Sequence, residues 1–211
     1  MQSYDPPRQA LAIASAALAG SIDAAGYLSA NRYFVSFMSG NTTRLGVDLA
    51  TTPGSAIMPV LLIGGFVAGV VGGSLVSARA GDQRKFAVLA AVALLLAGAA
   101  LANLTGSGNV TLALLVLAMG AINNTFQRDG GVAVGVTYMT GALVRLGQGI
   151  AARISGTGGE GWVLWFFLWL GLALGAVAGA MAWLRFPELM LWLAALWAGA
   201  LSIAARRLPR A

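Results

Sequence analysis

The sequence predicts an all-α integral membrane protein built from two inverted repeats of three transmembrane helices, each repeat carrying a broken or re-entrant half-helix segment. Three observations lead to this fold class. The chain is too apolar for a soluble domain, and its two halves carry the same motif about a hundred residues apart. In addition, its Lys and Arg residues divide unequally between the loops that join the apolar segments.

Composition identifies lipid as the solvent. Apolar residues make up 58% of the 211 residues and charged residues only 9%, whereas a soluble domain carries about a quarter charged residues. The net charge of +6 therefore indicates membrane topology first, and we expect no nucleic-acid partner. The chain has no Cys and no His, so it lacks thiolate chemistry and the commonest metal ligand. We expect no metal, no cofactor and no enzymatic activity.

The two halves match residue by residue. Residues 38–46 read Met-Ser-Gly-Asn-Thr-Thr-Arg-Leu-Gly, and residues 139–147 read Met-Thr-Gly-Ala-Leu-Val-Arg-Leu-Gly. Glycine ridges further along also match, and they predict close helix packing: Gly65, Gly69 and Gly73 with Gly171, Gly175 and Gly179. We divide the chain into a first membrane repeat at 1–105 and a second at 106–211, together one membrane domain. Internal repeats in a polytopic membrane protein point first to a transporter or channel.

Eight apolar segments follow one another, and two of them are unusual. A membrane span needs about 20 apolar residues. Segments two and six each have a Ser/Thr-Gly pair at the middle and an Arg five residues after that Ser or Thr, which a helix broken near mid-membrane explains most simply. The segments run roughly over residues 9–30, 33–50, 56–78, 86–104, 109–127, 131–152, 161–184 and 187–205.

The positive charges favour a topology in which segments two and six do not cross. If all eight segments cross, Lys and Arg divide five inside against six outside. If segments two and six enter and leave on the same face, nine Lys and Arg residues lie inside and two outside, which obeys the positive-inside rule. Each repeat then crosses three times, so the second is inserted upside down. We expect a multi-pass protein of the bacterial inner membrane with both termini cytoplasmic.

The broken segments supply the predicted site. Ser39 and Thr140 are suitable N-caps, and Gly40 and Gly141 allow a sharp turn and close approach of a ligand. Half-helices from these residues to about residues 50 and 153 would be ~16–20 Å long, so their N-termini would meet near the midplane. Unpaired N–H groups and the positive dipole ends favour an anion or a polar solute there. Asn41 follows Gly40 in this turn.

Four further charged or polar positions accompany these turns. Arg44 and Arg145 form an electropositive vestibule in one interpretation; in the other they reach the interface or close a salt bridge, with Asp23 and Asp48 as partners for Arg44. An acid at the depth of Asp23 is costly unless paired or hydrated. It is the candidate coupling group, or else it makes a structural bond to the broken helix. Asn123 stands at the matching position.

These residues carry a resemblance to a known family. Asp23, followed about sixteen residues later by Ser39-Gly40-Asn41 and then by Leu45-Gly46, resembles the YoaK-type family of small bacterial inner-membrane proteins. That family usually has Thr where Ser39 stands. The resemblance covers most of the chain and implies a polytopic bacterial membrane protein without implying a substrate.

Our leading hypothesis is therefore a transporter or channel for a small polar or anionic solute. The alternative is a non-transporting scaffold or lipid-binding assembly partner, in which the glycine ridges serve a homo-oligomer and the inside Arg cluster binds membrane lipid. The predicted solute-binding residues are Ser39, Gly40, Asn41, Arg44, Asn123, Thr140, Gly141 and Arg145, with Asp23 for proton coupling.

Overall fold

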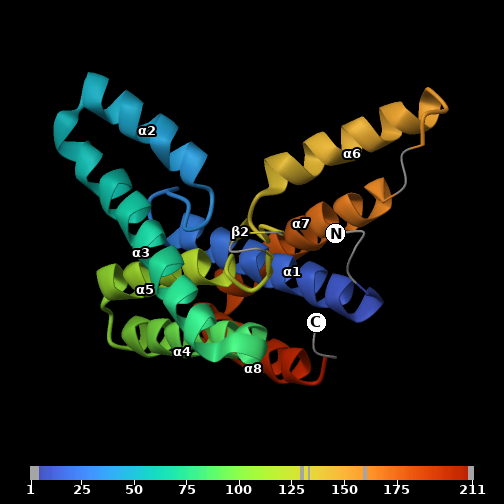
Figure 1. The fold of residues 1–211 in the computed structure, drawn as a ribbon. Helices are drawn as coiled ribbons and strands as arrows, with labels where there is room; N and C mark the ends of the chain where they lie inside the picture. Colours follow the sequence, from blue (N-terminus) through green and yellow to red (C-terminus); the bar gives the residue numbers. More distant parts are fainter. Residues whose placement is uncertain (1–4, 129–130, 133, 159–160, 209–211) are drawn as a thin grey trace.

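The computed structural model describes residues 5–128, 131–132, 134–158 and 161–208. Within these ranges the chain forms eight α-helices, two short 3-10 helices and one small antiparallel hairpin (Figure 1). The α-helices are α1 (Pro6–Ser29), α2 (Met38–Thr51), α3 (Ile57–Ala80), α4 (Arg84–Leu104), α5 (Gly108–Ile122), α6 (Met139–Ile154), α7 (Trp162–Arg185) and α8 (Pro187–Arg206). The remaining elements are the 3-10 helices η1 (Pro53–Ala56) and η2 (Gly81–Gln83) and the strands β1 (Gln127–Arg128) and β2 (Gly131–Val132).

Among the described helices, four stretches are long and apolar enough to cross a membrane. Helices α1, α7 and α8 each qualify alone, and the continuous stretch Pro53–Leu104 contains α3 and α4. Helix α5 is apolar but has only 15 residues. At ~1.5 Å per residue it is ~22 Å long, against a hydrocarbon core of about 30 Å. The chain is a multi-pass integral membrane protein.

Local sequence sets several helix ends. The Asp5 carboxylate caps α1 by accepting a hydrogen bond from the Arg8 N–H at 3.3 Å, and prolines occupy the first helical positions. Proline is tolerated there because a helix leaves those N–H groups unpaired in any case. Pro187 begins α8 in the same way. Helix α2 ends at Thr51, and its C-cap Thr52 precedes Pro53, a position that disfavours helical backbone.

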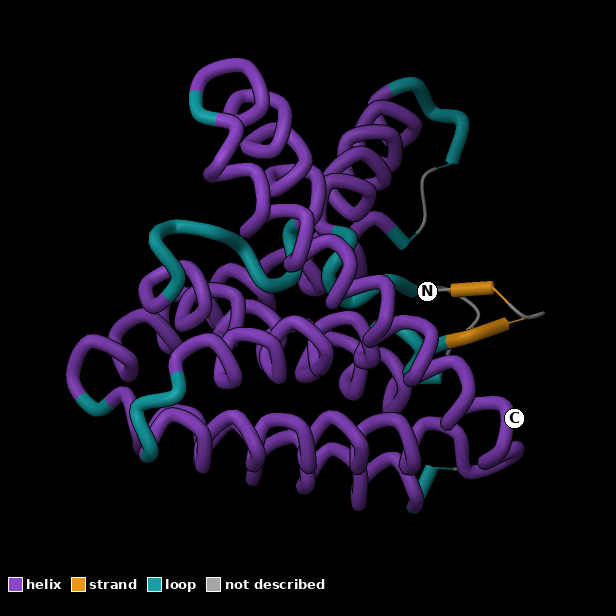
Figure 2. Tube along the Cα trace, turned by 90° about the vertical axis from the view of Figure 1, so that its left-hand side faces the viewer, coloured by secondary structure: helices purple, strands orange, loops and turns teal. Residues whose placement is uncertain are grey.

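The two halves of the chain interleave. Helix α1 packs against α7, α3 against α5 and α4 against α8 (Figure 1, Figure 2). Each pair joins a helix from residues 1–105 to one from residues 106–211. The halves therefore share one core, and neither could bury its apolar faces without the other.

Glycines make the closest of these contacts, in equivalent places in both halves. A Cβ added at Gly69 of α3 would meet the backbone of Leu117 in α5, and one added at Gly175 of α7 would meet the backbone of Ala17 in α1. Helix backbones can approach this closely only where no Cβ separates them. The packing role predicted for the glycine ridges is confirmed.

Helices α2 and α6 project from this bundle as two arms (Figure 1). Helix α2 packs against η1 and α3, and α6 packs against α7. With 14 and 16 residues they are ~21 and ~24 Å long, shorter than a hydrocarbon core of about 30 Å. Each ends within one residue of the predicted half-helix end, at Thr51 and Ile154.

The start of each half-helix differs from the prediction. Residues 33–37 and 134–138 are not helical, and the N-cap positions are Phe37 and Tyr138, which make no side-chain cap hydrogen bond. Ser39 and Thr140 therefore lie inside the first turn, and their predicted N-cap role is wrong. In α2 the reason is that the Phe37 carbonyl already accepts from the N–H groups of Gly40 and Asn41, at 3.1 and 3.3 Å.

Segment five is also shorter than its apolar run. The run extends to about residue 127, but α5 ends at Ile122. The Thr125 hydroxyl donates to the Ile122 carbonyl at 2.7 Å, and the Asn123 amide donates to the Met119 carbonyl at 3.0 Å. Side chains that bond the last carbonyls of a helix compete with its continuation. The β1–β2 hairpin follows, and about one and a half of the expected helical turns do not form.

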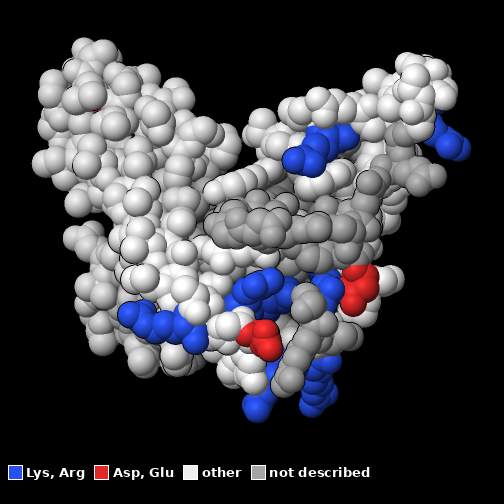
Figure 3. Space-filling model, viewed as in Figure 1, with Lys and Arg blue, Asp and Glu red and all other residues white. Residues whose placement is uncertain are grey.

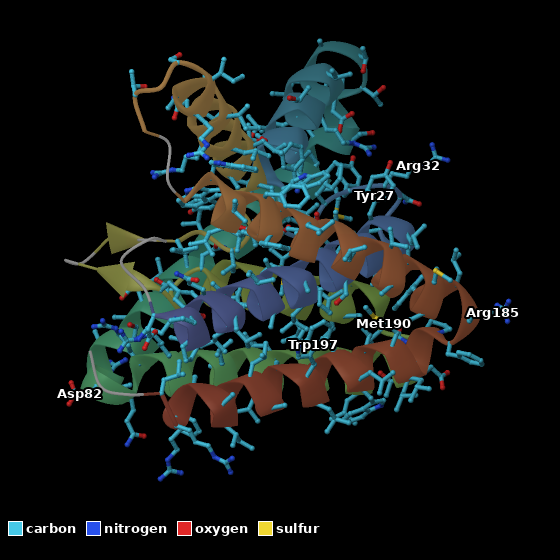
Figure 4. All side chains as sticks on the ribbon, turned by 90° about the vertical axis from the view of Figure 1, so that its right-hand side faces the viewer. Tyr27, Arg32, Asp82, Arg185, Met190 and Trp197 are labelled. Carbon is cyan, nitrogen blue, oxygen red and sulfur yellow. The ribbon has the colours of Figure 1, made fainter. Side chains whose placement is uncertain are left out.

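The charged residues lie mainly at the ends of the spanning helices. In Figure 4, Asp82 of η2 lies at one end of the bundle, whereas Arg32 after α1 and Arg185 at the end of α7 lie at the opposite end. On the face shown in Figure 3, most Lys and Arg side chains lie in the lower half, and others lie at the upper right, over α6. The loops that the charge count assigned to opposite faces thus lie at opposite ends of the molecule.

Candidate functional site

The loop before α2 is held against the C-terminal third of α1 by Asp23. One carboxylate oxygen of Asp23, Oδ1, accepts hydrogen bonds from the backbone N–H groups of Val35 and Ser36, at 2.9 and 2.8 Å. Asp23 lies six residues before the end of α1 at Ser29, which is roughly 9 Å along the helix. The loop therefore runs back along α1, and α2 begins well inside the end of that helix.

The Gly40-Asn41 pair fixes the same loop from the other side. The fully buried Asn41 side chain accepts from the Phe34 N–H at 3.1 Å and donates to the Phe34 carbonyl at 2.7 Å. A Cβ at Gly40 would lie 2.6 Å from the Phe37 ring and 3.0 Å from the Phe34 ring. The motif therefore positions these aromatic residues: Asn41 binds the Phe34 backbone, and Gly40 leaves room for both rings.

Arg44 stabilises the turn that reverses the chain after α1. Asn31 and Arg32 adopt positive φ angles of 48° and 64°, a conformation that costs free energy in residues other than glycine. The Arg44 guanidinium donates to the Arg32 carbonyl at 2.7 Å and lies 3.9 Å from the centre of the Tyr33 ring. The Tyr33 hydroxyl in turn donates to Asp48 at 3.2 Å.

The second half repeats the anchor with a neutral residue. The Asn123 side-chain oxygen accepts from the Thr137 hydroxyl at 3.1 Å and from the Thr137 N–H at 3.4 Å. Gly141 differs from Gly40, because a Cβ there would meet nothing within 4 Å. The Arg145 guanidinium lies 4.7 Å from the centre of the Trp165 ring in α7.

Asp23 forms no ion pair in the described part of the chain. The ion pair in that part of the chain joins Arg8 to Asp5, at 3.6 Å. The salt bridges suggested for Arg44, with Asp23 or Asp48, do not form, because its guanidinium binds loop carbonyls instead. A carboxylate in a spanning helix is costly unless it is paired or hydrated. Asp23 also lines a groove between α1 and α7.

Comparison with known proteins places this geometry in a family. Residues 11–204 match the family described as "Protein of unknown function (DUF1275)". The chain belongs to the DUF1275 family. A UPF0700 transmembrane protein of Rhizobium meliloti (strain 1021) is 41% identical over 206 residues, which cover 95% of this chain and 87% of that protein. No solved structure matches the chain. The expected membership of a family of membrane proteins is confirmed, and that family is DUF1275. The YoaK name is not confirmed.

The predicted site residues of this DUF1275 chain fall into two groups. Asp23, Gly40, Asn41 and Arg44 converge on the loop between α1 and α2. The second group comprises Asn123, which binds the loop before α6, and the residues of α6 itself, Thr140, Gly141 and Arg145. Among the described residues, no hydrogen bond or ion pair joins the two groups. Ser39 is exposed on α2.

Sequence reasoning missed the aromatic residues of the first half. Tyr27 and Phe34 have ring centres 5.0 Å apart, and Phe34 also contacts Phe37 edge to face at 5.2 Å. Their matching positions in the second half hold Gln127 and, for Phe34, Gly135. This one-sided difference between the repeats was visible in the sequence and could have identified them.

Proposed function

We propose that this DUF1275 protein is a transporter or channel for a small polar or anionic solute, bound near the bilayer midplane between the N-terminal ends of α2 and α6. The observation that carries the proposal is the pair of short helices that begin without side-chain caps. In Figure 1 their N-terminal ends point toward the centre of the molecule and their C-terminal ends point away from it. Free N–H groups and positive dipole ends there favour an anion or a solute rich in acceptors.

The proposed topology makes α2 and α6 re-entrant and the second repeat inverted. Arg32 precedes α2, and Asp82 follows α3. If α2 and α3 both crossed, these two residues would lie on the same face, but Figure 4 has them at opposite ends of the bundle. The same argument supports a re-entrant α6, because three crossings without it separate Asp82 from Arg185. Both termini and η2 are then cytoplasmic, in a bacterial inner membrane.

The proposed roles follow from position. Ser39, Gly40 and Asn41 form the first turns of α2, and Thr140 and Gly141 form those of α6. Arg44 and Arg145 add positive field beside these turns, and Asn123 holds the loop that leads to α6. We assign proton coupling to Asp23, because it is an unpaired acid in a spanning helix of the first half only.

The alternative function is a non-transporting membrane scaffold that assembles with itself or with lipid. One observation favours it: both arms expose apolar side chains, including Val47 and Leu49 on α2 and Val144 and Ile154 on α6. Helix faces of this kind are covered in a membrane by lipid or by another protein.

A flux experiment tests the transport proposal. Purified protein in proteoliposomes would be screened with small carboxylates, phosphate, sugars and polyols, each with and without a pH gradient. We expect saturable uptake of at least one solute, faster with the gradient if Asp23 couples a proton. No uptake of any solute above that of protein-free liposomes would favour the scaffold.

Two glycine variants on α2 make the test specific. Gly40→Val would push against the Phe34 and Phe37 rings and displace the start of α2, whereas Gly46→Val would meet nothing within 4 Å. We expect Gly40→Val to abolish uptake and Gly46→Val to retain it, with both proteins inserted in the membrane. Uptake at the wild-type rate by Gly40→Val would contradict a site at this helix end.

A further inference from the structure

A groove of about 260 Å³ lies between α1 and α7. Asp23 provides a carboxylate, Tyr27 and Phe34 provide aromatic rings, and the rest of the lining is apolar, including Leu172 and Ala176 of α7. Tyr27 lies toward the same end of the bundle as Arg32 (Figure 4). Pockets for drug-sized ligands are typically about 300–1,000 Å³, so this groove suits a smaller molecule.

The charge of Asp23 is not needed to hold the loop. In the second half a neutral amide oxygen, that of Asn123, accepts the equivalent bonds from Thr137. Both backbone bonds to Asp23 use Oδ1, which an asparagine would also supply, and the Ser36 side chain also bonds the carboxyl group. Neither Lys nor Arg lines the groove, and the described part of the chain offers Asp23 no ion pair. The carboxylate therefore brings to the groove a negative charge without a structural purpose.

The aromatic rings beside this charge are held in place. Phe34 is fixed by both hydrogen bonds from Asn41, and its ring lies against the space that Gly40 leaves empty. Tyr27 packs on Phe34 at an interplanar angle of 37°. Aromatic faces attract cations through their quadrupole, most strongly where water is excluded. A carboxylate together with two aromatic rings is a cation-binding combination.

The equivalent space in the second half is filled with polar side chains. There Asn124 donates to the Val70 carbonyl at 3.0 Å, and Gln127 donates to Asn124 at 2.7 Å and accepts from Ser77 at 2.9 Å. In the first half Ala24 and Tyr27 stand at the positions of Asn124 and Gln127. The acid and the aromatic pair thus line the groove together in the first half, whereas Asn, Gln and Gly stand at the matching positions 123, 127 and 135.

We infer that this groove binds a small organic cation, an amine or quaternary ammonium group with a short apolar substituent. The ammonium group lies against Asp23 and the two rings, and the substituent contacts the apolar wall of α7. This groove shares Asp23 with the proposed proton coupling, but its lining includes no residue of α2 or α6, and binding of a cation in it does not require transport. An anion is excluded because the carboxylate would repel it.

Binding of choline to the purified protein in detergent tests this inference. Isothermal titration calorimetry would compare choline with 3,3-dimethylbutan-1-ol, which has the same shape and no charge. We expect saturable choline binding and at least tenfold weaker binding of the neutral analogue. Absence of saturable choline binding, or equal binding of the two compounds, would overturn the inference.

Variants locate the site. Asp23→Asn keeps the oxygen that the loop needs and removes the charge, so it should fold and bind choline at least tenfold more weakly. Tyr27→Leu removes one ring, makes no change at the loop anchor, and should weaken binding several-fold. Asn123→Asp adds a carboxylate at the matching position, where no aromatic pair accompanies it, and should create no second site. Unchanged binding by folded Asp23→Asn, or by Tyr27→Leu if the former does not fold, would refute the proposal.

The same ammonium chemistry could come from free solutes or from lipid headgroups, and nanodiscs distinguish them. Choline would be titrated into protein in phosphatidylglycerol discs and in phosphatidylcholine discs. Equal affinity in both assigns the groove to a free cation. At least tenfold weaker binding in phosphatidylcholine discs assigns it to the headgroup, which then occupies the same carboxylate and rings.

Discussion

Asp23 in α1 and Asn123 after α5 hold equivalent loops in the two halves of the chain. Asp23 accepts from the N–H groups of Val35 and Ser36 at 2.9 and 2.8 Å, and Asn123 accepts from the Thr137 hydroxyl and N–H at 3.1 and 3.4 Å. A carboxylate oxygen in one half and an amide oxygen in the other thus accept the hydrogen bonds that hold the loop. What the fold requires at this position is an oxygen, and the charge is available for function.

Removal of the Asp23 oxygen should destabilise the protein, whereas removal of its charge should not. Asp23→Ala leaves the Val35 and Ser36 N–H groups without their acceptor, at about 1–3 kcal/mol for each group. We expect a loss of about 2–6 kcal/mol in unfolding free energy, measured by SDS titration with tryptophan fluorescence. Asp23→Asn should stay within about 1 kcal/mol of the wild type. Equal loss in the two variants would show that the charge itself stabilises the loop.

Asn41 should be among the least replaceable residues of α2. Asn41→Leu removes both hydrogen bonds to Phe34 and leaves a buried N–H and carbonyl unpaired, at a cost of about 2–4 kcal/mol. Thr42→Val is the matched control, because the exposed Thr42 hydroxyl bonds only the Met38 carbonyl of its own helix. Melting temperature in detergent is the measurement, and similar values for the two variants would count against the anchor.

Adjacent glycines on α3 should respond in opposite ways. A Cβ at Gly73 would lie 2.8 Å from the Cα of Ala121 in α5, whereas one at Gly72 would meet nothing within 4 Å. We expect Gly73→Leu to separate α3 from α5 and to abolish the monodisperse peak in size-exclusion chromatography, and Gly72→Leu to elute like the wild type. A normal elution profile for Gly73→Leu would mean that these helices pack less closely.

Cysteine labelling should distinguish the two faces, because the native chain has no Cys. We predict that Gln83→Cys in η2 reacts with a membrane-impermeant maleimide only after cells are opened, and that Gly54→Cys in η1 reacts in intact cells. Both positions are exposed. Labelling of Gln83→Cys from outside, together with protection of Gly54→Cys, would contradict the proposed topology, because a crossing α2 would place η1 inside and η2 outside.

The positions of most helices could be predicted from the sequence, because a chain that crosses lipid needs long apolar helical segments. Apolar runs, prolines and loop charges placed seven of the eight helices within about two residues at their C-terminal ends, and the glycine ridges correctly predicted which faces pack. Helix α5 was the exception, since its apolar run continues beyond Ile122. The side chains of Asn123 and Thr125 donate hydrogen bonds to the preceding carbonyls of α5 and so compete with the backbone N–H groups that would continue the helix. A hydropathy pattern does not show this competition.

By itself the sequence determined a membrane protein of two matched halves with a short polar-ended helix in each, because composition and spacing are properties of the chain alone. The tertiary structure decided how each motif residue acts. Asn41 and Gly40 hold Phe34, Arg44 binds a strained turn, and Asp23 faces a groove. Those roles depend on residues 31–37 folding back along α1, and such a long-range approach is set by hydrogen bonds and side-chain volumes in three dimensions.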